Sequence, residues 1–171
     1  MNIKDLYHKV AEFEAKLSEK SRSLSQCKAG CSRCCYTDIS VFSVEADNIR
    51  SWFSSLDDDQ KHILRLSWKK NLRETENFFG DKVQSCAFLS DEKCSIYEAR
   101  PLICRTQGLA FAFREAETSF VDICPLNEPV IDSLVPTDIV NLDLLNTILA
   151  KLDGSQGQRV KLSDLKDEFS V

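Results

Sequence analysis

The sequence predicts a mainly α-helical fold: a small helical domain with a minor β-hairpin, organised around a metal centre ligated by cysteines. Several segments repeat apolar residues at steps of three and four, which is the helical period. One segment near residues 109–123 alternates apolar and polar residues around a charged turn, which favours a hairpin. Eight cysteines are present, and four of them lie within residues 27–35. That density favours metal ligation over ordinary packing.

Length and composition indicate one globular domain, residues 1–171, with a metal-binding core at about 27–125 between terminal helices. The apolar share of 43% and the charged share of 29% are those of a soluble globular protein. A net charge of -5 argues against a nucleic-acid partner or an anionic membrane surface. No apolar run approaches the roughly 18 residues of a membrane-spanning helix. The charged N-terminus has no apolar signal segment, so we expect a cytoplasmic protein.

Three helices are expected in the first half of the chain. Residues 3–20 have an apolar stripe at helical spacing. Ser43 is the expected N-cap of a second helix, with Glu45 in its first turn. The acidic triplet 57–59 is expected to cap a third helix, which ends near the stop residue Gly80.

In the second half, residues 109–123 form the predicted hairpin. Pro136 then opens a last strong helix, which Gly154 ends. The final segment 162–169 is expected to pack weakly or to fray.

The first cysteine group reads C-x3-C-x2-C-C and comprises Cys27, Cys31, Cys34 and Cys35. On a helix these four side chains would fall within an arc of about 100°. Gly30 makes a tight turn an equal alternative. Either geometry directs the sulfurs to one side. Neighbouring side chains diverge, so Cys34 and Cys35 suit two metals, or one ligand and one bridging thiol, better than one tetrahedral ion.

The second group is dispersed and comprises Cys86, Cys94, Cys104 and Cys124. The polar insert 90–93 predicts a turn that brings Cys86 and Cys94 together. Pro101 suits the first position of a short helix, and Cys104 would lie one turn into it. All eight cysteines are therefore candidate metal ligands, in one multinuclear centre or in two four-cysteine sites.

Zinc and iron both accept four thiolates, so ligand type does not separate a zinc site from an iron–sulfur cluster. A zinc ion with four thiolates carries a charge of about -2, which favours nearby cations. Arg100, Arg105 and Tyr97 are the candidates for positions beside the ligands, and Lys28 and Arg33 also lie close in sequence. Disulfides in an exported protein, or cysteines that serve only as small buried apolar residues, are the alternatives.

The first group, followed by Cys86-x7-Cys94-Ser-Ile-Tyr97-x2-Arg100-Pro101-x2-Cys104-Arg105, resembles the YkgJ-like CxxCxxCC cysteine-cluster family. The resemblance spans about residues 27–125. The first spacing is x3, where the family name implies x2. Members are described as zinc- or iron-chelating and often as containing iron–sulfur clusters. The resemblance therefore implies metal chelation and no particular reaction.

Two functions follow from these expectations. The first is a non-enzymatic protein that binds zinc or iron through eight thiolates. The alternative is a redox-active or sensing iron–sulfur protein that works with an unidentified protein partner. A zinc enzyme is less favoured, because an all-cysteine zinc site leaves no open position for water. The chain also contains no P-loop, no dinucleotide-binding glycine pattern and no evident S-adenosylmethionine site.

Overall fold

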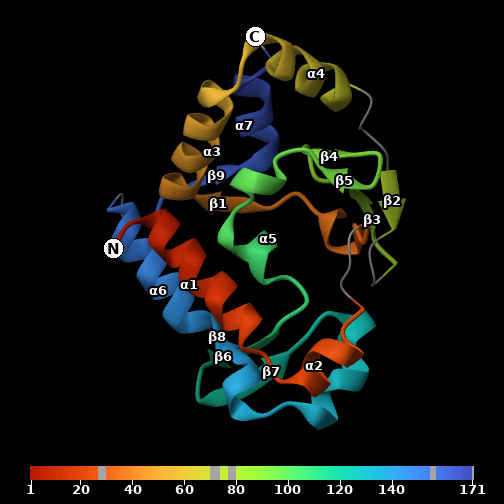
Figure 1. The fold of residues 1–171 in the computed structure, drawn as a ribbon, viewed down its shortest axis with the longest axis vertical. Coiled ribbons are helices and arrows are strands. Elements are labelled where there is room, and N and C mark those ends of the chain that lie inside the picture. Colours follow the sequence, from red (N-terminus) through yellow and green to blue (C-terminus); the bar gives the residue numbers. More distant parts are fainter. Residues whose placement is uncertain (27–29, 70–73, 77–79, 155–156, 171) are drawn as a thin grey trace. The chain divides into compact units, whose positions relative to one another are not determined.

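The computed structural model describes residues 1–26, 30–69, 74–76, 80–154 and 157–170. These residues divide into two compact units, which we describe separately (Figure 1). Unit 1 comprises Met1–Ala29 and Arg105–Gly154, and unit 2 comprises Gly30–Cys104 and Ser155–Val171. The single domain expected from chain length stays a prediction.

The fold class is mixed α/β, so the prediction of a mainly α protein is wrong. Of the described residues, 53% are helical and 19% lie in strands, and the strands form several sheets. Most strands have only two or three residues. So short a run cannot display a period-two pattern, and it becomes a strand because a distant segment pairs with it.

Unit 1 contains a three-stranded sheet in the order β7-β6-β8 (Figure 1). β6 (Ala110–Glu115) and β7 (Thr118–Asp122) pair antiparallel, which confirms the predicted hairpin. β8 (Ile139–Asn141) pairs parallel to β6, and α6 (Leu142–Asp153) contacts β6.

The two N-terminal helices of unit 1 are α1 (Ile3–Ala15) and α2 (Glu19–Leu24). The single helix expected over 3–20 is therefore divided, because the Ser18 side chain accepts a hydrogen bond from the Ser21 amide and starts a new helix. α2 contacts a 3₁₀ helix at Pro125–Ser133.

The last strong helix begins later than predicted. Pro136–Asp138 is a 3₁₀ turn, β8 follows it, and α6 starts only after Asn141, whose side chain accepts from the Leu144 amide at 2.8 Å. Asp138 does not cap α6. Its carboxylate accepts hydrogen bonds from Ser18 and Ser21 instead. Gly154 ends α6 in the left-handed conformation (φ 63°), as predicted.

Asp138 makes unit 1 sensitive to acid. Its carboxylate is 2% exposed and accepts from the Ser18 hydroxyl at 2.6 Å and the Ser21 hydroxyl at 2.5 Å. Burial raises the pKa of this carboxyl, but the hydrogen bonds from Ser18 and Ser21 outweigh burial and lower it below its ordinary value. A lowered pKa stabilises the folded state above the unfolded-state pKa, about 3.9, and that stabilisation is lost as pH falls through the folded value.

We therefore expect Asp138→Asn to lower the free energy of unfolding by about 1–3 kcal/mol at neutral pH. The difference from the wild type should shrink as pH falls below about 4 towards the lowered pKa of the folded state, where the folded wild-type carboxyl becomes protonated too. Urea denaturation at several pH values measures this. Asp132→Asn, at an exposed position of unit 1, is the control. A loss for Asp138→Asn that is equal at pH 3 and pH 7 would contradict the electrostatic explanation.

Unit 2 contains most of the remaining elements, and its strands form antiparallel pairs (Figure 1). Its helices are α3 (Ser43–Ser55), α4 (Asp58–Trp68), α7 (Leu162–Glu168) and the start of α5 (Leu102–Thr106). β1 (Ser40–Phe42) pairs with β9 (Arg159–Lys161), β2 (Glu74–Glu76) with β3 (Lys82–Gln84), and β4 (Leu89–Ser90) with β5 (Lys93–Cys94).

Two of the predicted helix boundaries in unit 2 need correction. α3 has Phe42 as its N-cap, not Ser43. Asp57 caps α4, as the acidic triplet predicted, by accepting from the Gln60 amide at 2.7 Å. α4 ends at Trp68 rather than near Gly80, because residues 74–76 pair as β2 with β3.

The core of unit 2 includes the C-terminal helix α7, so the expectation that residues 162–169 pack weakly is wrong. Leu162 is 1% exposed and Leu165 is fully buried. Phe169 stacks on Phe53 with ring centroids 4.3 Å apart. The helix is short, but β9 precedes it directly and pairs with β1, which holds it against α3.

Candidate metal centre

Unit 2 contains six of the seven cysteines that the structure describes, and all seven have free thiols. These six are Cys31, Cys34, Cys35, Cys86, Cys94 and Cys104. Cys124 belongs to unit 1, where it precedes the 3₁₀ helix at Pro125–Ser133. Cys27 and Lys28 lie outside the described residues.

The described members of the first cysteine group, Cys31, Cys34 and Cys35, lie in a turn and not in a regular α-helix. We call residues 31–36 the cysteine turn. It contains a 3₁₀ helix, Arg33–Cys35, whose Cys35 amide donates to the Ser32 carbonyl at 2.7 Å. Gly30 precedes it with φ 88°, a conformation that favours glycine. The Cys86 amide donates to the Cys35 carbonyl at 2.6 Å, so the second cysteine group begins directly beside the first.

Cys86 precedes the hairpin formed by β4 and β5, Cys94 is the last residue of β5, and the connection between the two strands forms the predicted turn. Cys94 lies opposite Leu89 in the ladder, and both cysteines pack against the core of unit 2. The segment after Cys94 is attached to that core. Trp68 Nε1 donates to Ser95 Oγ at 2.7 Å, and Ser95 Oγ donates to the Phe88 carbonyl at 2.8 Å.

Cys104 lies on α5, whose start is held by the buried carboxylate of Glu45. Glu45 is 2% exposed. One carboxylate oxygen accepts from the Phe42 amide at 3.2 Å, and the other accepts from the Leu102 amide at 2.7 Å. Pro101 stands just before the first residue of α5, close to its predicted place. Sequence reasoning placed Glu45 only in a helix first turn and missed its contact with α5.

Cys34 and Cys35 of the cysteine turn share a hydrogen bond, which shifts their pKa values in opposite directions. A hydrogen bond from the Cys35 side chain and, to a smaller extent, the positive charge of Arg100 lower the pKa of Cys34 to about 7, although burial opposes them. The same hydrogen bond and burial raise the pKa of Cys35 far above its ordinary value. Of these two thiols, Cys34 therefore ionises at the lower pH.

In unit 2, the three thiols beyond the cysteine turn have raised pKa values, which favours their neutral forms. Burial raises the pKa of Cys86 to about 11 and also raises the pKa values of Cys94 and Cys104. The charges of Cys86, Cys94 and Cys34 each raise the pKa of Cys104 further, so these side chains lie within electrostatic reach of one another. Several thiolates can coexist here only if a cation balances them, and metal binding would release their protons.

The donors are of the type that zinc and iron select, since soft thiolates suit both metals. Among the described residues, however, no group of three or more His, Cys, Asp or Glu side chains already has the arrangement needed to hold an ion. Cys34, Cys86, Cys94 and Cys104 of unit 2 thus interact electrostatically, but their side chains are not arranged as a complete coordination shell.

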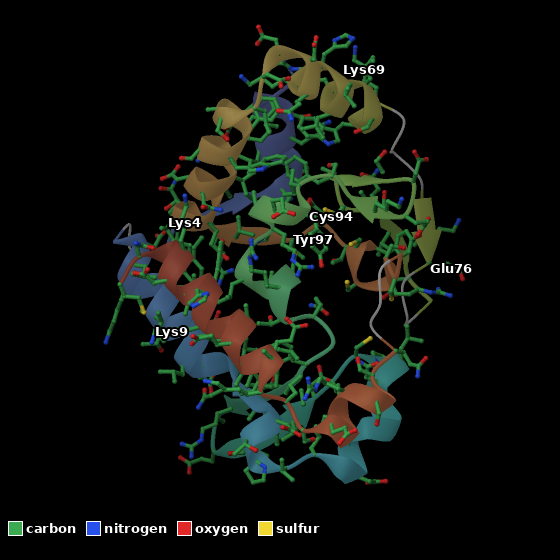
Figure 2. All side chains as sticks on the ribbon, in the orientation of Figure 1. Lys4, Lys9, Lys69, Glu76, Cys94 and Tyr97 are labelled. Carbon is green, nitrogen blue, oxygen red and sulfur yellow. The ribbon has the colours of Figure 1, made fainter. Side chains whose placement is uncertain are left out.

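The candidate neighbours of the ligands divide between the units. Arg100 lies over the ring of Tyr97, 3.9 Å from the ring centroid, and its charge favours the thiolate forms of Cys34 and Cys94. Tyr97 follows Cys94 in unit 2, and Figure 2 labels both. Arg105 belongs to unit 1, where its guanidinium lies 4.2 Å from the ring centroid of Tyr7.

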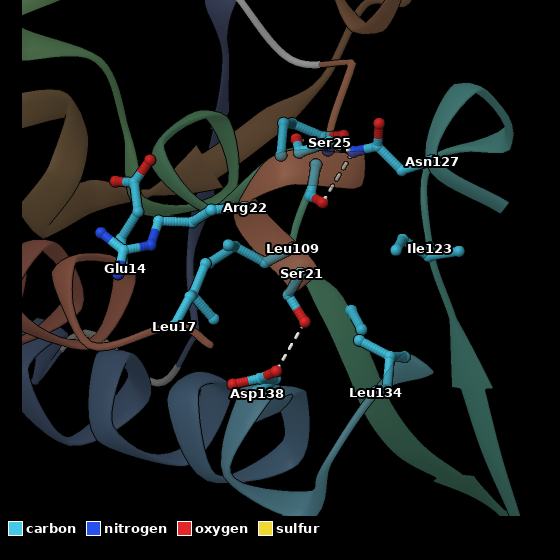
Figure 3. A pocket seen from close by; sticks show the side chains of 13 residues that line it. Glu14, Leu17, Ser21, Arg22, Ser25, Leu109, Ile123, Asn127, Leu134 and Asp138 are labelled. Atoms are coloured by element: carbon cyan, nitrogen blue, oxygen red, sulfur yellow. Dashed lines mark hydrogen bonds between the residues drawn. The ribbon is translucent and has the colours of Figure 1, made fainter. Parts of the chain in front are cut away.

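Unit 1 has a cavity of about 310 Å³ that the sequence did not indicate (Figure 3). Leu17, Leu109 and Leu134 are among its apolar lining residues. Asp138 lies at its edge, with a hydrogen bond to Ser21. Asn127, which is fully buried, closes another side. It accepts from the Gln26 amide at 2.7 Å and donates to the Gly108 carbonyl at 2.9 Å.

No helix within the described part of the chain is long and apolar enough to cross a membrane.

Comparison with known proteins agrees with this donor chemistry. Residues 26–125 match the CxxCxxCC family, described as "Putative zinc- or iron-chelating domain". Comparison with curated proteins and with solved structures found no match. The family match covers more than half of the 171 residues and includes every cysteine. The chain belongs to the CxxCxxCC family of zinc- or iron-chelating domains.

Proposed function

We propose that the chain binds zinc or iron through its cysteine thiolates, most of which lie in unit 2, as a metal-binding protein and not as a stand-alone enzyme. The observation that supports this proposal most is that cysteines from segments far apart in the sequence lie in the same compact unit. The cysteine turn, Cys86, the β5 residue Cys94 and the α5 residue Cys104 lie in one unit, and the charges of Cys34, Cys86 and Cys94 each raise the pKa of Cys104. A cation is what relieves the mutual repulsion of their ionised forms.

The proposed ligand set is all eight cysteines, in one multinuclear centre or in two sites. Cys27 and Cys124 are included on sequence grounds. Arg100 and Tyr97 are proposed to lie beside the ligands, where the positive charge of Arg100 would balance part of an excess thiolate charge. Arg105 keeps the same proposed role on the basis of its place next to Cys104 in the chain.

Elemental analysis after anaerobic purification tests the proposal. We expect zinc or iron in a stoichiometric amount. We expect Cys104→Ser and Cys94→Ser each to lower the metal content by a larger fraction than the loss of a single ligand would account for. Ser163→Ala, an exchange at a residue without sulfur in unit 2, is the control. A folded wild-type protein that binds neither metal and has all of its thiols free would refute the proposal.

A redox-active or sensing iron–sulfur protein is the second candidate, and the number of thiols favours it. One tetrahedral ion takes four thiolates, whereas unit 2 alone contains six described cysteines, including the adjacent Cys34 and Cys35. An iron–sulfur cluster uses the surplus by binding more than one metal. A partner protein would then supply or remove electrons.

The visible spectrum separates the two candidates. Zinc has no redox chemistry, so a zinc protein is colourless and does not respond to dithionite. We expect an iron–sulfur cluster to absorb broadly near about 400 nm and to bleach on reduction. Iron together with acid-labile sulfide supports the redox candidate, and zinc without colour supports the chelating protein.

A further inference from the structure

The hairpin that contributes Cys94 is attached to the cysteine turn by one side chain. Glu92 lies in the two-residue connection between β4 and β5. Its carboxylate accepts hydrogen bonds from Tyr36 Oη at 3.0 Å and from Ser32 Oγ. Ser32 lies between Cys31 and Cys34, and Tyr36 directly follows Cys35. The Glu92 carboxylate therefore accepts hydrogen bonds from residues near both ends of the cysteine turn.

The backbone at this position is unfavourable for glutamate. Asp91 has φ 49° and Glu92 has φ 60°, so both central residues of the hairpin turn are left-handed. Turns of this type prefer Asn-Gly or Asp-Gly, and a residue with a long side chain costs more there than glycine. A glutamate in such a place is explained when its side chain makes interactions that glycine cannot make.

We infer that Glu92 is a positioning residue of the metal centre: it holds the Cys94 hairpin against the cysteine turn and so preorganises ligands from both. The inference rests on the proposed metal-binding function. Without the carboxylate, the two segments must be ordered at the moment of metal binding, and that ordering costs affinity. The hydrogen bond from the Cys86 amide to the Cys35 carbonyl joins the two segments near the start of the hairpin. Glu92 joins them at the tip of the hairpin.

Two glycine substitutions in the same turn separate the carboxylate from the backbone. Glu92→Gly removes the side chain and relieves the left-handed conformation. The matched control, Asp91→Gly, also relieves that conformation, but the carboxylate that it removes makes none of these hydrogen bonds to the cysteine turn. Zinc affinity is measured by competition with a chromophoric chelator on reduced, metal-free protein. We expect Glu92→Gly to bind zinc about tenfold more weakly or worse, and Asp91→Gly to bind like the wild type. Glu92→Gln, which keeps an oxygen acceptor, should recover most of the affinity.

The outcomes that overturn the inference are distinct from those that overturn metal binding. A wild type that binds neither zinc nor iron refutes the proposed function. A wild type that binds zinc with Glu92→Gly equally tight refutes the role of Glu92, as do equal losses in both glycine variants. If far-UV circular dichroism shows that Glu92→Gly is unfolded, the double variant Ser32→Ala/Tyr36→Phe, which leaves the turn intact, takes its place with the same expected loss.

Discussion

Removal of the metal is expected to lower the melting temperature by at least about 10 °C, since metal binding to a site absent from the unfolded chain adds directly to folding free energy. The Cys86–Cys35 backbone hydrogen bond and the Glu92 carboxylate join the cysteine turn to the Cys94 hairpin, and the Glu45 carboxylate of α3 holds the start of α5. Buried thiols that repel one another when ionised add little cohesion of their own. A bound metal would add a further connection between these segments.

Differential scanning calorimetry with and without a strong chelator measures this effect under reducing conditions. Cys104→Ser should melt well below the wild type when metal is present, because serine is a poor ligand for the same ion. In chelator the variant and the wild type should melt within a few degrees of each other. A wild-type melting temperature that chelation leaves unchanged would show that the cysteines are not structural ligands.

Phe88→Ala should produce the second large effect, a loss of about 3–5 kcal/mol in the free energy of unfolding. The Phe88 side chain is fully buried. In the sequence, Phe88 lies after Cys86 and directly before β4. Its ring meets Trp68 edge-on at a centroid distance of 5.3 Å and lies 6.3 Å from Phe169. Truncation would leave a cavity beneath the hairpin that carries Cys94, in a core that cannot close around it fully.

Urea denaturation of the metal-loaded protein measures the loss as a shift in midpoint. Phe88→Leu, which preserves most of the volume, should cost less than the alanine variant. Ile63→Ala removes a side chain on α4 that is 65% exposed and should change stability by no more than about 0.5 kcal/mol. An alanine variant at position 88 with the stability of the Ile63 control would contradict the packing described for unit 2.

The sequence alone determined the features that depend on near neighbours along the chain. The acidic triplet predicted the Asp57 cap, which forms with a residue three positions later. Gly154 predicted the end of α6, and alternation around a charged turn predicted the β6–β7 hairpin. The cysteine spacing was enough to indicate the family and its zinc- or iron-chelating chemistry.

Only the tertiary structure decided the mixed α/β class and the connections between the thiol-bearing segments. β1 becomes a strand by pairing with β9, and β8 by pairing with β6. Glu45 reaches Leu102 across 57 positions, and Asp138 reaches Ser18 across 120. A capping box or a helical stripe repeats within three or four residues, so the sequence displays it. A buried carboxylate takes whichever amide or hydroxyl the fold brings to it, and no local pattern records that partner.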